Sequence, residues 1–335
     1  MKMKILIIIV LLLIGTVKNL NAQTFSGGTG SQSTPYLISN IDDILELTDL
    51  VNNEQNNENW SKGKFFRLIQ DITDTVRTPI GNSFIMAAQR DRRFRGNFDG
   101  NGYRIIIGMN IVGNFNFGGL FGVVVDAKIS NLRVEGYLTI NAEVGGGIVG
   151  QMSTTANEKN YIINCVSSVN LTAISGHAGG IVGNANNVII KNCIYNGTLF
   201  VSGNTAYIPI RAGGIAGSID SPHSDSIINC FNLGNILNGR TATALFVQIG
   251  GVVGNAFNLS IINGANYGFV KCNDSGTATN SGVGGITGYA VNTAISNNFN
   301  SGVVIGNGNV GCIIGNAGTN TVLENNHYDK QMCGD

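Results

Sequence analysis

The sequence predicts an all-β protein, a right-handed parallel β-solenoid (β-helix) of about seven coils with an N-terminal α+β cap. Three observations lead there: a glycine pentad recurs seven times, one asparagine recurs with it, and residues 103–328 carry no helical periodicity. A repeat of roughly 20–50 residues is typical of stacked units that bury their apolar faces on one another. Parallel crossover connections are overwhelmingly right-handed, which gives the predicted hand.

The pentad reads Gly-Gly-apolar-apolar-Gly and is degenerate in its last copy. Its copies begin at Gly118, Gly146, Gly179, Gly213, Gly250, Gly284 and Gly311. The shortest of these steps leave no room for the four strands of a propeller blade, which repeats at about 40–50 residues. We expect the paired glycines to let the backbone turn tightly beside a crowded interior, and the second of each pair is taken as the structural glycine. These structural glycines are Gly119, Gly147, Gly180, Gly214, Gly251 and Gly285.

One asparagine follows each pentad, usually after a β-branched residue. In stacked coils these side chains would form a ladder at a bend, each amide bonding to the next. The predicted ladder consists of Asn131, Asn164, Asn192, Asn229, Asn263, Asn297 and Asn325. Replacing Asn229 with leucine should destabilise the stack by a few kcal/mol through an interrupted amide ladder, and an unchanged melting temperature would show that the ladder is not buried.

Residues 1–22 are predicted to be a signal peptide. Lys2 and Lys4 precede an apolar run from Ile5 to Gly15, and Leu20-Asn21-Ala22 provides a cleavage site after Ala22. The apolar run is about half the roughly 20 residues that a membrane span needs. We therefore expect a secreted or cell-surface protein with no transmembrane segment in the mature chain.

The rest of the chain divides into three predicted parts. Residues 23–105 lack the pentad and form the cap, with one amphipathic helix from Ser39 to Asn53 that begins at Asn40 as N-cap. Residues 106–328 form the solenoid repeats, and residues 329–335 form a C-terminal tail. No cap is evident after the last repeat. Our hypothesis is that a partner protein or a missing segment covers the C-terminal coil.

The six cysteines have two interpretations, disulfide bonds or free thiols. Cys165, Cys193 and Cys230 occupy the same slot in successive repeats, Cys312 replaces a pentad glycine, and Cys272 and Cys333 stand alone. An exported chain can form disulfides, but parallel stacked cysteines fit the bond geometry poorly. We favour buried free thiols that act as small hydrophobes.

Composition gives no reason to expect a nucleic-acid partner. The formal net charge is zero and only 12% of residues are charged. The basic run from Arg90 to Arg95 is expected to be a solvated loop of the cap. The three histidines lie in separate repeats without metal-ligand spacing, and no phosphate-binding loop follows the pentads. We expect no cofactor and no metal.

The acidic residues of the repeats offer little support for an enzyme. Glycoside hydrolysis needs two carboxylates that face one cleft, and polysaccharide lyases of β-helical fold need clustered acids and a base. The best candidate is Asp220, His223 and Asp225 in a polar insertion between two coils. An ordinary surface loop is the favoured interpretation of this insertion, and we expect no catalytic residues.

The chain resembles the GLUG-motif proteins, which are secreted or surface-exposed bacterial repeat proteins. The resemblance rests on the repeated Gly-Gly-Leu-Phe-Gly and Gly-Gly-Ile-Val-Gly pentads, on Pro35-Tyr36-Leu37-Ile38, and on the segment from Phe94 to Tyr103. It implies a β-solenoid and an adhesin-like role, and it supplies no catalytic residues. We therefore predict a non-enzymatic scaffold that binds an unknown glycan or protein ligand along a solenoid face or at the loops 151–161, 202–212, 218–226 and 238–248. A carbohydrate-active β-helix enzyme is the alternative.

Overall fold

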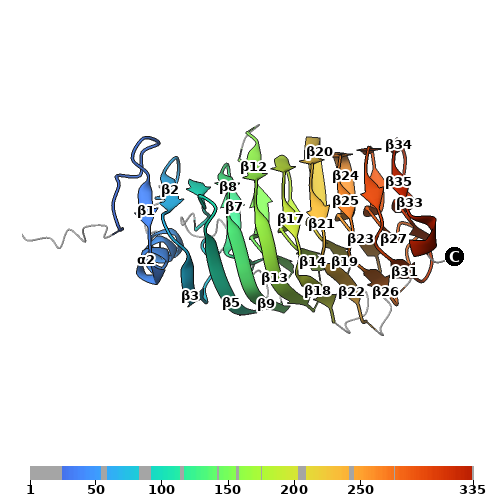
Figure 1. Cartoon of the computed structure of the whole chain (residues 1–335), viewed down its shortest axis with the longest axis horizontal. Coiled ribbons are helices and arrows are strands. Elements are labelled where there is room, and N and C mark those ends of the chain that lie inside the picture. Colours follow the sequence, from blue (N-terminus) through green and yellow to red (C-terminus); the bar gives the residue numbers. More distant parts are fainter. Residues whose placement is uncertain are drawn as a thin grey trace, which may run out of the picture.

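The protein is a single elongated stack of β-coils with a helix at one end (Figure 1). The computed structural model describes residues 25–53, 59–82, 92–113, 117–141, 143–155, 158–174, 176–202, 209–240, 245–274 and 276–333, without the side chains of His223 and Ser224. The predicted signal peptide and the last two residues of the predicted tail lie outside these ranges. The strands form three long sheets whose neighbours pair in parallel, so the prediction of a parallel β-solenoid is confirmed.

The first sheet has 15 strands and bends around two sides of the stack. Its members are β1 (Tyr36–Ile38), β2 (Phe65–Leu68), β4 (Asn97–Asp99), β7 (Phe121–Val125), β8 (Lys128–Ser130), β11 (Val149–Ser153), β12 (Asn160–Ile163), β15 (Val182–Ala185), β16 (Val188–Lys191), β20 (Ala216–Ile228), β24 (Val253–Ile262), β28 (Thr287–Val291), β29 (Ala294–Ser296), β33 (Ile314–Ala317) and β34 (Val322–Glu324).

The two other sheets complete the circuit of each coil. The 7-stranded sheet contains β6 (Phe117–Gly118), β10 (Val144–Gly146), β14 (Gly176–Gly179), β19 (Ile210–Gly213), β23 (Val247–Gly250), β27 (Gly282–Gly284) and β32 (Val310–Gly311). The 13-stranded sheet contains β3 (Ile72–Val76), β5 (Arg104–Val112), β9 (Arg133–Asn141), β13 (Val166–Ala173), β17 (Ile194–Tyr195), β18 (Thr198–Val201), β21 (Phe231–Asn232), β22 (Asn235–Asn238), β25 (Ala265–Asn266), β26 (Val270–Cys272), β30 (Phe299–Asn300), β31 (Val304–Gly306) and β35 (His327–Tyr328).

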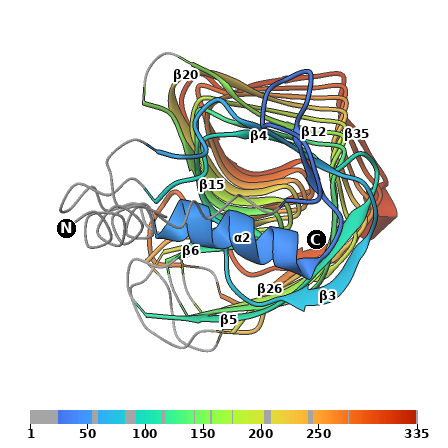
Figure 2. The same ribbon diagram turned by 90° about the vertical axis from the view of Figure 1, so that its left-hand side faces the viewer.

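One helix covers the N-terminal end of the stack. α2 spans Ile41–Asn52, and the side chain of its N-cap, Asn40, accepts a hydrogen bond of 3.0 Å from the Asp43 backbone N–H. Its buried residues include Ile44, Leu47 and Val51. Figure 2 shows the helix lying across the first coils. No helix among the described residues is long and apolar enough to span a membrane.

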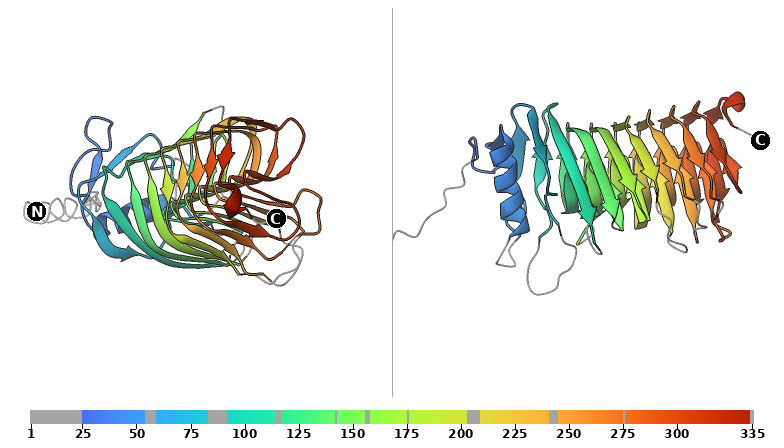
Figure 3. Two further views of the ribbon diagram at one scale, coloured as in Figure 1. Left: turned by 45° about the vertical axis from the view of Figure 1, so that its right-hand side comes forward. Right: turned by 90° about the horizontal axis from the view of Figure 1, so that it is seen from below.

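The strands of the cap region continue the solenoid. β1, β2, β4 and β8 pair consecutively and in parallel, for example Phe66 with Phe98. β5 crosses the boundary predicted between residues 105 and 106 and pairs with β9 in unbroken register from Arg104 to Val112. Among the described residues, α2 at one end and a short C-terminal turn at the other depart from the coil geometry (Figure 3).

The recurring asparagine marks the corner between the 15-stranded and 13-stranded sheets. All seven members have φ between 52° and 56°, a left-handed conformation that asparagine adopts more readily than most residues. The Asn164 amide donates to Asn131 Oδ1 at 3.0 Å, and the same bond joins Asn192 to Asn164, Asn229 to Asn192 and Asn263 to Asn229. We call this row the corner ladder. The hydrogen bonds between these side-chain amides are solvent-exposed, not buried.

This exposure changes the expected effect of replacing Asn229. Leucine should cost about 2 kcal/mol, mostly through left-handed backbone strain and only partly through an exposed hydrogen bond. Glycine at the same position relieves the strain and should cost less than leucine. Chemical denaturation of the two variants would separate the cost of backbone strain from the cost of the lost hydrogen bond. Equal losses for leucine and glycine would show that the amide bond dominates after all.

The second glycine of the pentad is required because neighbouring atoms leave no room for a Cβ, and not because its backbone has an unusual φ. The backbone φ is not left-handed at Gly147, Gly180, Gly214, Gly251 and Gly285, in contrast to the expectation of a tight glycine turn. A Cβ on Gly251 would lie 2.2 Å from the Gly285 carbonyl oxygen and 2.4 Å from Asn266 Cγ. The second pentad glycine therefore makes room for a side chain buried behind it.

Three of those side chains form a second row of amides, which was not predicted from the sequence. Asn232, Asn266 and Asn300 stack in register on β21, β25 and β30 and are fully buried. The Asn232 amide donates to Asn266 Oδ1 at 2.7 Å, and the Asn266 amide donates to Asn300 Oδ1 at 2.8 Å. We call these three residues the inner amide row.

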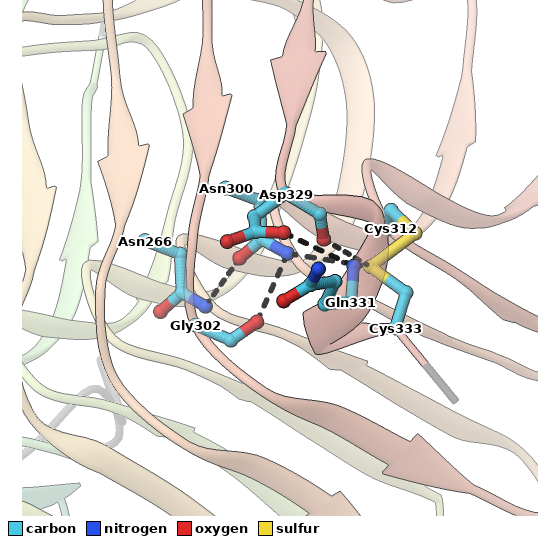
Figure 4. Close-up of a disulfide and its surroundings, with 7 residues drawn as sticks. All are labelled: Asn266, Asn300, Gly302, Cys312, Asp329, Gln331 and Cys333. Carbon is cyan, nitrogen blue, oxygen red and sulfur yellow. Dashed lines mark hydrogen bonds between the residues drawn. A yellow bond between two sulfur atoms is a disulfide. The ribbon is translucent and has the colours of Figure 1, made fainter.

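The C-terminal end is closed by a disulfide, which corrects the prediction of free thiols for two of the six cysteines. Cys312 bonds to Cys333, which follows the 3-10 helix η1 (Lys330–Met332) (Figure 4). Residues 329–333 therefore form a tethered turn. Cys165, Cys193, Cys230 and Cys272 are free and buried, as predicted. Burial, reinforced by its cysteine neighbours, raises the pKa of Cys193, so this thiol is chemically inert.

Candidate functional site

The predicted loop site at Asp220, His223 and Asp225 is not a loop. Residues 216–228 form one continuous strand, β20, which pairs with β24 through a register shift between Asp220 and Asp225. Asp220 is exposed, whereas Asp225 is fully buried. The His223 side chain lies outside the described part of the structure. The interpretation of this segment as a surface loop was wrong, because the irregularity is absorbed as a bulge within the sheet.

Asp225 has a structural role. Its Oδ1 accepts hydrogen bonds from Lys159 Nζ at 2.8 Å and from the Val188 backbone N–H at 2.9 Å. Burial raises the pKa of Asp225, and the contacts with Lys159 and Val188 oppose this shift. A buried carboxylate that already pairs with a lysine and a backbone amide secures the bulge and presents no open face to a substrate.

The other expected binding loops are only partly described. Residues 156–157, 203–208 and 241–244 of these loops lie outside the described ranges. Among the described residues no group of three His, Cys, Asp or Glu side chains could hold a metal ion.

A surface cluster on the outer face of the 13-stranded sheet was not predicted. Phe231, Leu233, Tyr267 and Phe299 lie on three successive coils, and we call them the aromatic stripe. The side chains of Leu233, Tyr267 and Phe299 are 49%, 51% and 39% exposed. The rings of Tyr267 and Phe299 have centroids 6.1 Å apart. Strands β21 and β25, which carry part of the stripe, are labelled in Figure 1.

Sheet register explains how the stripe forms. Phe231, Ala265 and Phe299 occupy one outward row on β21, β25 and β30. The small Ala265 side chain is buried between coils that each carry an aromatic ring. Tyr267 follows on the same coil as Ala265 and contacts the Phe299 ring. The stripe thus spans three coils, and its middle coil contributes the small Ala265 in the outward row and Tyr267 beside it.

The corner ladder runs beside this stripe. Asn229, Asn263 and Asn297 each stand two residues before the outward row of the stripe. Within the described structure, Asn229 and Asn263 each use one amide N–H in the ladder, which leaves the second N–H for another acceptor. Exposed aromatic rings lie next to a row of amides that each have one N–H available. Such a surface can bind a molecule that has both an apolar face and hydroxyl groups.

A polar cluster lies on the 7-stranded sheet and includes one residue from each of the expected loops 202–212 and 238–248. His177, Arg211 and Gln248 stack in register on β14, β19 and β23. Arg211 bonds to His177 Nε2 at 3.1 Å and to Gln248 Oε1 at 3.0 Å. Burial, aided by the positive charge of Arg211, lowers the pKa of His177 to about 4, while the neighbouring Asn184 acts in the opposite direction. His177 is therefore neutral at physiological pH and serves as an acceptor for Arg211.

Comparison with known proteins identifies no family. No protein-family model matches the chain. Over 152 residues, 44% of this chain, it is 30% identical to a protein of Evansella cellulosilytica described as a "Putative Gly-rich membrane protein". The chain spans 16% of that protein's length. A crystal structure from Bacteroides ovatus, described as a "putative immunoglobulin A1 protease", is similar with a TM-score of 0.48 and 19% identity, over 86% of this chain and 87% of that one.

Proposed function

We propose that the protein is an exported, non-enzymatic scaffold of the GLUG-motif kind that binds a glycan across its aromatic stripe. The observation that carries this proposal is the exposure of Leu233, Tyr267 and Phe299 beside the amides of the corner ladder. The C–H faces of a sugar ring pack on aromatic rings, and its hydroxyl groups hydrogen-bond to side-chain amides. The regular spacing of coils, about 4.8 Å, suits a polymer that lies along the solenoid.

The predicted signal peptide supports this proposal, because an exported protein meets glycan polymers outside the cytoplasm. The stripe also lacks catalytic groups: Phe231, Leu233, Tyr267 and Phe299 carry no carboxylate, and a glycosidase needs two. A binding role therefore suits these side chains better than the carbohydrate-active enzyme considered above.

Binding to immobilised polysaccharides would test the proposal. We expect the Tyr267→Ser, Phe299→Ser double variant to bind at least about tenfold more weakly, because each aromatic contact contributes of order 0.5–1.5 kcal/mol beyond its buried area. Tyr137→Ser is the matched control, since Tyr137 is 54% exposed on β9 of the same sheet, outside the stripe.

Three outcomes would contradict the proposal. The double variant could bind like the wild-type protein, or no polysaccharide in a broad panel could bind at all. Release of reducing or unsaturated sugar ends during the assay would instead favour the enzyme alternative.

A further inference from the structure

We infer that a second site, a groove at the N-terminal end of the solenoid, binds the carboxylate of an acidic sugar; this inference rests on the proposed glycan-binding function. The groove has a volume of about 320 Å³ and lies over β2, β4 and β8. Its volume is within the range of small-ligand sites in proteins, roughly 300–1,000 Å³. Its lining includes Gln32, Phe65, Arg67, Asn97, Asp99 and Lys128.

The register of the sheet arranges these side chains in two rows. Phe65, Asn97 and Lys128 occupy equivalent positions on three successive coils. Arg67 and Asp99 form the neighbouring row, two residues further along their strands. Because one coil follows the next at about 4.8 Å, an apolar ring, an amide and an ammonium group are aligned beside a guanidinium group.

The one carboxylate that lines the groove already accepts three hydrogen bonds. Asp99 Oδ1 accepts hydrogen bonds from the Asn131 amide at 2.9 Å and from the Asn101 backbone N–H at 3.0 Å. Asp99 Oδ2 accepts from Arg67 Nε at 3.0 Å. Asp99 is also the only carboxylate among the residues that line the groove. It therefore fixes the Arg67 side chain and has little capacity left for a ligand.

Apart from Asp99, the groove is lined by two cationic side chains and by neutral amides and a hydroxyl group, which carry no negative charge. Among the described residues, Lys128 Nζ, the Asn97 amide and the terminal amino groups of Arg67 have no hydrogen-bond partner. Such a set requires a ligand with acceptors and negative charge. The Phe65 ring supplies an apolar surface for a sugar ring, so a uronic acid matches the groove better than an isolated anion.

The test compares three sugar hexamers of the same linkage: galacturonic acid, galactose and sulfated galactose. We expect the wild-type protein to bind the galacturonic acid hexamer most tightly, and Arg67→Gln or Lys128→Gln to weaken that binding about tenfold, the typical effect of removing one charge-assisted hydrogen bond. Binding of the galactose hexamer should not change. Lys191→Gln is the control, because Lys191 is an exposed lysine on β16 of the same sheet, outside the groove.

The outcomes separate this inference from the proposed function. Equal binding of the uronic acid and galactose hexamers, unaffected by the groove variants, would overturn the groove assignment alone. A preference for the sulfated hexamer would overturn the carboxylate assignment. Uronic acid binding could depend on Arg67 and Lys128 but not on the residues of the aromatic stripe. That result would support the groove as a binding site and contradict the stripe as one. Absence of binding to any hexamer or polysaccharide would overturn both.

Discussion

Replacing Asn266 with leucine is expected to lower the free energy of unfolding by about 3–5 kcal/mol. Asn266 is fully buried in the middle of the inner amide row. Leucine removes the bonds to Asn232, to Asn300 Oδ1 and to the Gly268 carbonyl oxygen. Each buried polar group left without a partner costs roughly 1–3 kcal/mol, and no water can reach these groups to replace the lost bonds. Chemical denaturation would measure the loss.

Two comparisons make this prediction specific to burial. Asn196→Leu is the control, because Asn196 is exposed and its side chain has no hydrogen-bond partner among the described residues; it should change stability by less than about 0.5 kcal/mol. Replacing all three members of the row with leucine should cost less than the sum of the single changes, because no half-satisfied partner remains. Additive losses would contradict a connected row.

Acidification from pH 6.5 to pH 4 is expected to remove about 3 kcal/mol of stability through His177 alone. The pKa of His177 falls from an ordinary 6.5 to about 4 in the folded protein, because the ring is buried and lies beside Arg211. The unfolded state then binds a proton at pH values where the folded state does not. The contribution of His177 is therefore complete above pH 6.5 and is lost as the pH falls towards 4.

His177→Gln tests this origin, because glutamine keeps an acceptor for Arg211 without titrating. We expect the variant to lose the part of the pH dependence between 6.5 and 4, measured as denaturation midpoints across that range. His327→Gln is the control, since His327 lies exposed on β35, and its pH profile should follow the wild type. An unchanged profile for His177→Gln would assign the acid sensitivity to other groups.

The features that are local in sequence were the ones that could be predicted. α2 begins at Asn40 because a capping side chain precedes a periodic apolar face, and both are visible in a short window of residues. The corner asparagines were also predictable, since each coil repeats the same left-handed bend. Even so, the depth of the corner ladder was misjudged, because sequence repetition does not show which side of a bend faces solvent.

The features that were missed depend on contacts between distant residues. The segment around Pro222 has a typical loop composition, but Lys159, 66 residues from Asp225, supplies the charge that lets the carboxylate remain inside the sheet. The aromatic stripe combines side chains whose shared face appears only after the coils are stacked. The inner amide row did have a sequence signal: Asn232, Asn266 and Asn300 each follow a corner asparagine by three residues.

The cysteines show a further limit. The expectation of free thiols was based on stacking in equivalent slots, which holds for Cys165, Cys193 and Cys230. Cys312 and Cys333 lie in different parts of the last coil, and the turn through η1 brings their Cα atoms to 5.5 Å. That approach depends on the path of the chain after β35, which repeat spacing does not contain.

The parallel stacking of the coils has a mechanical consequence. Because the strands lie across the long axis, the hydrogen bonds between two coils run along that axis. Tension along the axis on a terminal strand would break these bonds one after another, whereas a pull along the strands would load them together and require more force. The Cys312–Cys333 bond closes the last coil into a loop, so a pull on the C-terminus cannot unwind the residues between them. The easier route of mechanical failure is thus blocked at that end.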